Sequence, residues 1–166
     1  RTSSIPRINR VRRPAPLVLL VSLAIAGCGS ADQDKTPVAC LSGPRAFTDA
    51  LREAPGAVRL AGGTLISECI VPNQSAGDLA NVGGTLVKVS TELNTEARAK
   101  PGGPANVELG YLTGAVNRGA ADTAGIHAEL VRRLAVAASF SPGGGALPSA
   151  FRREYEKGYA AGKDHG

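Results

Sequence analysis

The chain has 166 residues, and its formal net charge of +5 comes from the N-terminal end, where residues 1–16 hold five arginines and no acidic residue. Elsewhere 14 Lys and Arg balance 14 Asp and Glu, so the rest of the chain is neutral and lacks the clustered cations of a nucleic-acid-binding domain. The part after position 27 is long enough for one domain with a buried core.

The first 28 residues have the three parts of a bacterial export signal. The basic segment 1–16 precedes an apolar run, LVLLVSLAIA, at 17–26, and Gly27 follows. A basic region, a short apolar region and a small residue before the cleavage point are typical of a secretory signal. The run has about half of the ~20 residues that a membrane-spanning helix needs, so it predicts a cleaved signal at 1–27.

The tetrapeptide Ile25-Ala26-Gly27-Cys28 resembles the lipobox of bacterial lipoproteins. This resemblance implies that a diacylglycerol is joined to the Cys28 sulfur, that residues 1–27 are removed, and that an acyl chain such as palmitate often follows on the new amine. Two chains on one residue meet the two-signal requirement for stable anchoring. We therefore expect an extracytoplasmic protein that Cys28 holds on the outer face of a membrane.

Other interpretations of the N-terminal segment stay open. It could be an ordinary secretory signal with a chance cysteine. Arg12-Arg13 could belong to a twin-arginine signal, although the Pro-Ala-Pro that follows departs from that pattern. The chain begins with Arg and contains no Met, so we expect the true start of the reading frame to lie upstream.

Cys40 and Cys69 are the two cysteines that remain if Cys28 carries lipid. Export places them in an oxidising compartment, where disulfides persist. No histidine lies near either cysteine in the sequence, and a redox CxxC spacing is absent. We predict a Cys40–Cys69 disulfide and expect no metal and no cofactor.

Residues 28–39 are mostly small and polar, which predicts a flexible tether before a single helical domain at 40–166. Ser42 is expected to cap a short helix that ends at Pro55-Gly56. Its apolar face has helical spacing and consists of Phe47, Ala50, Leu51 and Ala54. Segment 56–72 is less regular, and its pattern favours a brief extended piece and then a short helix capped by Thr64.

The strongest helical signal begins at Ser75, which forms a capping pair with Asp78. A stripe with spacings of three and four follows, made of Leu79, Val82, Leu86, Val89 and Leu93. Residues 100–104, KPGGP, break this helix, and a second apolar stripe extends over about 105–140. Two amphipathic helices joined by a short loop predict a long antiparallel αα-hairpin.

The second predicted helix is unusually rich in small residues, including Gly110 and Gly114. Each interior glycine costs about 1 kcal/mol of helix propensity relative to Ala, so close approach by a neighbouring helix is expected to offset that cost. The alternative is a helix broken near Gly119 or Gly125. The GxxxG spacing at 110–114 has charged and polar neighbours, which excludes a position in lipid.

Ser149 is expected to cap a last helix whose aromatic stripe, Phe151, Tyr155 and Tyr159, packs on the hairpin, whereas residues 162–166 are expected to fray. The predicted class is all-α: a small helical bundle built on a long antiparallel αα-hairpin with short N- and C-terminal helices. The segments PGGP, GYLTGAVNRGAADTAGIHAELVRRL and FRREYEKGYAAGK resemble uncharacterised exported lipoproteins of actinobacteria, and this resemblance implies no activity or site.

The sequence offers no catalytic constellation. His127 has no carboxylate one helical turn away, and neither a GxSxG turn, a phosphate-binding loop nor paired metal-ligand spacing occurs. We predict a non-catalytic interaction or structural module of the cell envelope that holds an envelope protein partner and binds no nucleic acid. The alternative is a small-ligand binder with a pocket lined by Tyr111, His127, Tyr155 and Tyr159, and an enzyme comes third.

Overall fold

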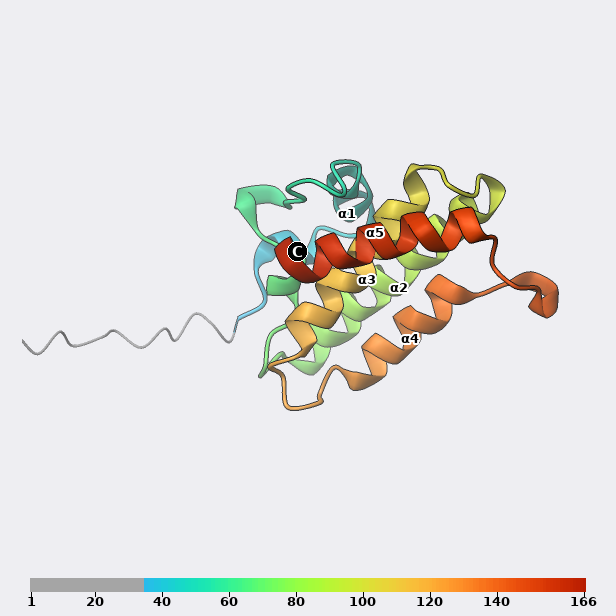
Figure 1. Ribbon diagram of the computed structural model, residues 1–166. Coiled ribbons are helices and arrows are strands. Elements are labelled where there is room, and N and C mark those ends of the chain that lie inside the picture. Colours follow the sequence, from blue (N-terminus) through green and yellow to red (C-terminus); the bar gives the residue numbers. More distant parts are fainter. Residues whose placement is uncertain (1–34) are drawn as a thin grey trace, which may run out of the picture. The chain divides into compact units, whose positions relative to one another are not determined.

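A computed structural model describes residues 35–166, and this part of the chain contains α-helices and short 3₁₀ turns but no strand (Figure 1). The α-helices are α1 (Pro44–Leu51), α2 (Ala76–Ala99), α3 (Pro104–Ala120), α4 (Ala128–Ser139) and α5 (Ser149–His165). The 3₁₀ turns are η1 (Val38–Leu41), η2 (Ala61–Gly63), η3 (Ser67–Cys69) and η4 (Pro142–Gly144). The all-α class is confirmed. The signal at 1–27, Cys28 and the tether up to residue 34 lie outside the described residues.

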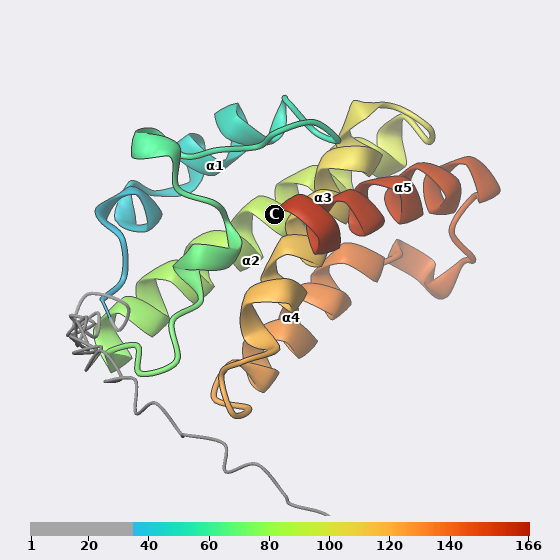
Figure 2. The same cartoon turned by 60° about the vertical axis from the view of Figure 1, so that its left-hand side comes forward.

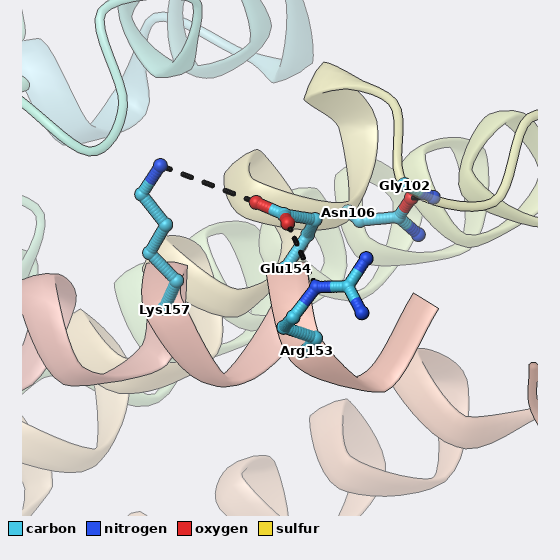
Figure 3. Close-up of polar contacts among 5 residues, drawn as sticks. All are labelled: Gly102, Asn106, Arg153, Glu154 and Lys157. Atoms are coloured by element: carbon cyan, nitrogen blue, oxygen red, sulfur yellow. Dashed lines mark hydrogen bonds and ion pairs between the residues drawn. The ribbon is translucent and has the colours of Figure 1, made fainter. Parts of the chain in front are cut away.

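The α2–α3 hairpin forms as the sequence predicts. The Ser75 hydroxyl oxygen accepts a hydrogen bond from the Asp78 backbone N–H at 3.1 Å, which caps α2. After the break, the Asn106 side chain closes the turn from both sides: its Oδ1 accepts from the Gly102 N–H at 2.6 Å and its Nδ2 donates to the Ala97 carbonyl at 3.3 Å. Figure 3 shows Asn106 beside Gly102 in this turn. The contact brings the end of α2 to the start of α3, so the two helices are antiparallel.

The expected single helix over 105–140 is wrong, because the chain turns between α3 and α4. Ala124 and Gly125 have φ of 49° and 86°, and residues in the left-handed region cannot continue a right-handed helix. The alternative of a break near Gly125 is therefore correct. The other candidate, Gly119, stays inside α3, where an added Cβ would lie 2.9 Å from the Ile70 Cβ. Close packing explains this glycine.

The α4 helix runs alongside α2 in the same direction (Figure 2). An added Cβ at Gly83 would contact the Leu130 side chain at 3.6 Å. Further along both helices, the Asn94 side-chain amide donates to the Ala138 carbonyl at 2.6 Å. Leu130 and Leu134 are buried and join α4 to the core.

The α5 helix packs on α3 with the backbones in direct contact, which confirms the predicted role of the small residues. An added Cβ at Gly110 would lie 2.8 Å from the Tyr159 nitrogen, and one at Gly158 would lie 2.8 Å from the Val107 carbonyl carbon, with the carbonyl oxygens closer still. Gly114 and Gly162 repeat both contacts one turn later, so the helices are parallel. The glycine Hα atoms point at these oxygens, the geometry of Cα–H···O contacts at helix interfaces.

The N-terminal part of the fold differs in detail from the prediction. Gly43, not Ser42, precedes α1, and the Ser42 hydroxyl donates to the Val38 carbonyl within η1. Thr64 caps no helix either, because its hydroxyl donates back to the Ala61 carbonyl. The Glu68 carboxylate accepts from the Leu65 N–H at 2.8 Å just before η3.

The last turn of α5 is held in place, contrary to the expected fraying. The Arg118 guanidinium on α3 donates to the Asp164 carbonyl, and the Ser67 hydroxyl donates to the Gly166 carbonyl. Gly166 is buried, with an added Cβ clashing with Ala115. The glycine contact between α3 and α5 continues to this point, which is why the turn stays helical. None of the helices described is long and apolar enough to cross a membrane.

Candidate functional site

The predicted disulfide is present and forms the centre of a small buried network. Cys40 and Cys69 have no exposed surface, their Cα atoms are 5.5 Å apart, and the bond joins η1 to η3. The Gln74 side-chain nitrogen donates to the Cys69 carbonyl at 3.1 Å and to the Thr36 hydroxyl at 2.9 Å. Thr36 is thus part of the fold, which begins earlier in the chain than the expected boundary at residue 40.

His127 belongs to the same network. It is fully buried at the start of α4, with its Nε2 2.9 Å from the Gln74 Oε1. Because the Gln74 nitrogen already donates twice, its oxygen is the acceptor and the His127 Nε2 carries the proton. Nδ1 is buried without a partner, and burial lowers the pKa of His127, which favours the neutral ring. This histidine fastens the α3–α4 turn to the loop before α2.

Tyr111 is fully buried as well. Its hydroxyl lies near the Val58 backbone without a hydrogen bond, and burial raises its pKa. Tyr111 and His127 expose no surface even to a water-sized probe, so no ligand-sized space lies beside either side chain. The pocket lined by Tyr111, His127, Tyr155 and Tyr159 is therefore not formed.

The α5 aromatic residues form a ladder on one helix face. The ring centroids of Phe151 and Tyr155 are 6.3 Å apart, as are those of Tyr155 and Tyr159. Phe151 is buried and the two tyrosines are half-buried. Burial raises the pKa of Tyr155, while a side-chain hydrogen bond with Thr113 opposes the rise. The stripe packs against α3 as the sequence predicts, and Phe151 and Tyr155 also border a hollow of about 250 Å³ between the end of α4 and α5.

The carboxylates that the structure describes do not gather into a metal site: no group of three His, Cys, Asp or Glu side chains could hold an ion within residues 35–166. Glu108 is the acidic residue whose pKa is raised, mainly by burial and then by the nearby Glu96 charge. Both carboxylates line a shallow hollow at the end of the α2–α3 hairpin together with Lys100, Gly103, Pro104 and Ala105.

A long apolar groove lies between α2 and α4. Its larger part has a volume of about 410 Å³ and is lined by Val87, Thr91, Asn94, Thr95, Arg132, Arg133, Val136, Ala137 and Phe140. A second hollow of about 250 Å³ continues toward the starts of both helices and shares Arg133. It is lined further by Ala76, Leu79, Ala80, Gly83, Gly84, Ile126, Glu129 and Leu130. We call the two hollows together the α2–α4 groove.

The α4 wall of the groove presents large hydrophobic side chains to solvent. Ile126, Val136 and Phe140 keep 42%, 55% and 61% of their surface exposed. Single exposed apolar residues are ordinary on a protein surface. Here Ile126 borders the smaller hollow and Val136 and Phe140 border the larger one, and exposed apolar side chains that gather along one groove are typical of an interaction site.

The α2 wall is uncharged and mostly small, with Leu79 and Asn94 as its larger members. Ala76, Ala80, Gly84, Val87, Thr91 and Thr95 line it at helical spacing. Sequence analysis missed this second stripe, because the larger residues of the core-facing stripe dominate the pattern. A helix with one large apolar face and one small uncharged face is the signal that could have revealed it.

Arginines mark the edge of the α2–α4 groove. Arg132 and Arg133 line it from α4, and Arg98 on α2 approaches its end, where the guanidinium lies 3.5 Å from the Phe140 carbonyl. The carboxylate of Glu129 accepts from Arg132 at 2.7 and 2.8 Å and balances one of these charges. The groove therefore has an apolar floor and a net positive rim.

Comparison with known proteins adds no relative: no family model, no curated protein and no solved structure matches this chain.

Proposed function

We propose that this protein is a membrane-anchored lipoprotein of the cell envelope whose folded domain is a non-catalytic interaction module. The observation that supports the interaction role is the α2–α4 groove. Exposed hydrophobic side chains of α4 border it on one side, and mostly small residues of α2 border it on the other. The anchor rests on the Ile25-Ala26-Gly27-Cys28 tetrapeptide, and the Cys40–Cys69 disulfide is compatible with an extracytoplasmic place.

A partner would gain free energy by covering this groove. Burying a large aliphatic or aromatic side chain fully contributes about 1.5–3 kcal/mol. Ile126, Val136 and Phe140 each have roughly half of that contribution still available. Of the large hydrophobic residues that the described part of the chain exposes, Ile126, Val136 and Phe140 border the groove, whereas Val38 and Leu41 lie in η1.

Crosslinking in living cells tests the interaction role. A photoreactive amino acid is placed at Thr91 in the groove, and a second variant carries it at the exposed Lys157 on α5 as the control. We expect one defined adduct with an envelope protein from Thr91 and none from Lys157. Equal labelling from both positions, or no adduct from the groove, would contradict an interaction surface there.

The anchor has its own test, which is independent of the groove. Mass spectrometry of the processed protein is expected to show Cys28 as the N-terminal residue with a diacylglycerol on its sulfur. A Cys28→Ser variant should stay unprocessed or appear in the soluble fraction. An unmodified cysteine in the mature protein would refute the lipoprotein proposal and leave the groove unaffected.

A further inference from the structure

The α2–α4 groove has the dimensions of a helix. At 1.5 Å per residue its α2 wall from Ala76 to Thr95 is about 28 Å long, and its α4 wall from Ile126 to Phe140 is about 21 Å long. An amphipathic helix of four to five turns would span this distance and lay its apolar face between the two walls.

The width of the groove comes from residues with almost no side chain. Gly84 has nothing within 4 Å of the place where its Cβ would be, and Ala76, Ala80 and Ala137 add only methyl groups. Small residues allow a partner helix to approach closely, with its own side chains filling the hollow. The groove is also open along its length, so a helix could keep its polar face in water, whereas an acyl chain would remain half solvated.

Charge decides between the candidate occupants. A second copy of this chain that paired symmetrically through the groove would bring its own Arg132 and Arg133 against the same pair, and the N-terminal residues 1–16 of this chain carry five arginines. Both would meet the positive rim with like charge. A flat bilayer surface would not fill a concave groove. Acidic residues at the edges of an apolar stripe would complement the rim.

We infer that the α2–α4 groove binds an amphipathic helix of a partner protein whose apolar stripe is flanked by Glu or Asp. This inference rests on the proposed interaction function and specifies the chemistry of the partner. Arg132, Arg133 and Arg98 select for the acidic flanks, and Val136 and Phe140 bind the apolar stripe.

Two designed peptides of 18 residues test the inference. Both have leucine at every third or fourth position, and they differ only in flanking residues, which are all Glu in one and all Lys in the other. Fluorescence anisotropy with the full chain at low salt should give an affinity at least ten-fold higher for the Glu peptide. Raising the salt concentration should reduce this difference, because exposed charges are screened.

Charge reversal supplies the matched variants. Arg132→Glu combined with Arg133→Glu should reverse the peptide preference, and the double change to Gln should abolish it while keeping the helix intact. Arg152→Glu with Arg153→Glu is the control, because it makes the same change on α5 and Arg153 likewise lies beside a carboxylate, Glu154 (Figure 3). The control should keep the ten-fold preference.

Several outcomes would overturn the inference. Equal affinities for the two peptides, or a preference that survives charge reversal at 132–133, would remove the acidic helix as the occupant. Binding to vesicles of phosphatidylglycerol, but to neither peptide, through the same two arginines would assign the surface to a membrane. In each case a Thr91 adduct in cells would leave the proposed interaction role standing, so the two failures are distinguishable.

Discussion

Replacing Gly158 by Ala tests whether the backbones of α3 and α5 are truly in contact. In a free helix the change would be favourable by about 1 kcal/mol, because Ala has the higher helix propensity. In this fold the new Cβ would lie 2.8 Å from the Val107 carbonyl carbon and 2.9 Å from the Tyr111 nitrogen, below the 3.0 Å that real Cβ atoms respect. We expect packing to outweigh propensity and the protein to become less stable.

The magnitude follows from what must move. The obstructing atoms are backbone, so no side chain can rotate away, and the whole of α5 has to shift from α3. Overpacking of a rigid contact typically costs about 1–3 kcal/mol, and the backbone clash places Gly158→Ala at the upper end. After subtraction of the propensity gain, the net loss is about 2 kcal/mol. At roughly 4 °C per kcal/mol for a domain of this size, the melting temperature should fall by about 8 °C.

Thermal unfolding followed by circular dichroism measures the change, and Gly84→Ala is the matched control. Gly84 also lies within a helix, but nothing is within 4 Å of its Cβ position. This variant should gain about 1 kcal/mol from propensity alone. If Gly158→Ala were stabilised as Gly84→Ala is, the close approach of the two helices would be refuted.

Three further changes probe other parts of the fold. Replacing Cys40 and Cys69 by Ser opens a loop with a sequence separation of 29, so urea unfolding should show a loss of roughly 3–4 kcal/mol, and an unchanged midpoint would count against the disulfide. Burial holds the pKa of His127 below its ordinary 6.5, so the unfolded chain binds more protons: stability is complete above pH 6.5 and falls as the pH drops below it. The urea midpoint should therefore be lower at pH 5.5 than at pH 7.5, and the His127→Gln variant should show a smaller difference between the two. If the variant kept the full difference, the pH dependence could not come from His127. Asn94→Ala should cost about 1–3 kcal/mol in the same urea assay, because the buried Ala138 carbonyl loses its donor; a loss below 0.5 kcal/mol would mean that water replaces the amide.

Local signals in the sequence predicted local structure well. Ser75 caps α2 because its hydroxyl needs only a neighbour three residues away, and the α2 stripe follows helical periodicity. The disulfide followed from the number of available partners. The apolar stripe of the second predicted helix continues through Ile126 and Leu130, so periodicity alone predicted one helix. The turn at 121–127 has only seven residues and preserves the spacing of the apolar positions on either side. The two helices are separated by the positive φ of Ala124 and Gly125, and the spacing of apolar residues does not reveal backbone angles.

The error at the end of α5 has a physical cause in the glycine contact between α3 and α5. Gly110 and Gly114 correctly indicated a close neighbour, but they could not say which helix it was. Gly158 and Gly162 have the same spacing on α5. The end of α5 was expected to fray because chain ends usually do. It is ordered because it contacts residues of α3 that lie some fifty residues away in sequence, which local sequence signals do not reveal. Such contacts become visible only when two stripes of small residues are considered together.

The break at 121–127 is also what creates the candidate site. A continuous helix from 105 to 140 would have extended beyond α2 and left no second wall beside it. The turn sends α4 back along α2, and the Asn94 amide and the buried His127–Gln74 hydrogen bond hold it at the two ends. Between these ends the α2 wall is small, so the helices touch through Gly83 and Leu130 and leave the groove open above. The α3–α5 glycine contact has no such opening, because there both helices are small at the interface. When both helices have small residues at their interface, as in α3 and α5, the backbones meet and leave no space. When one helix has small residues and the other has large side chains that face solvent, as in α2 and α4, a groove remains that could hold a third helix.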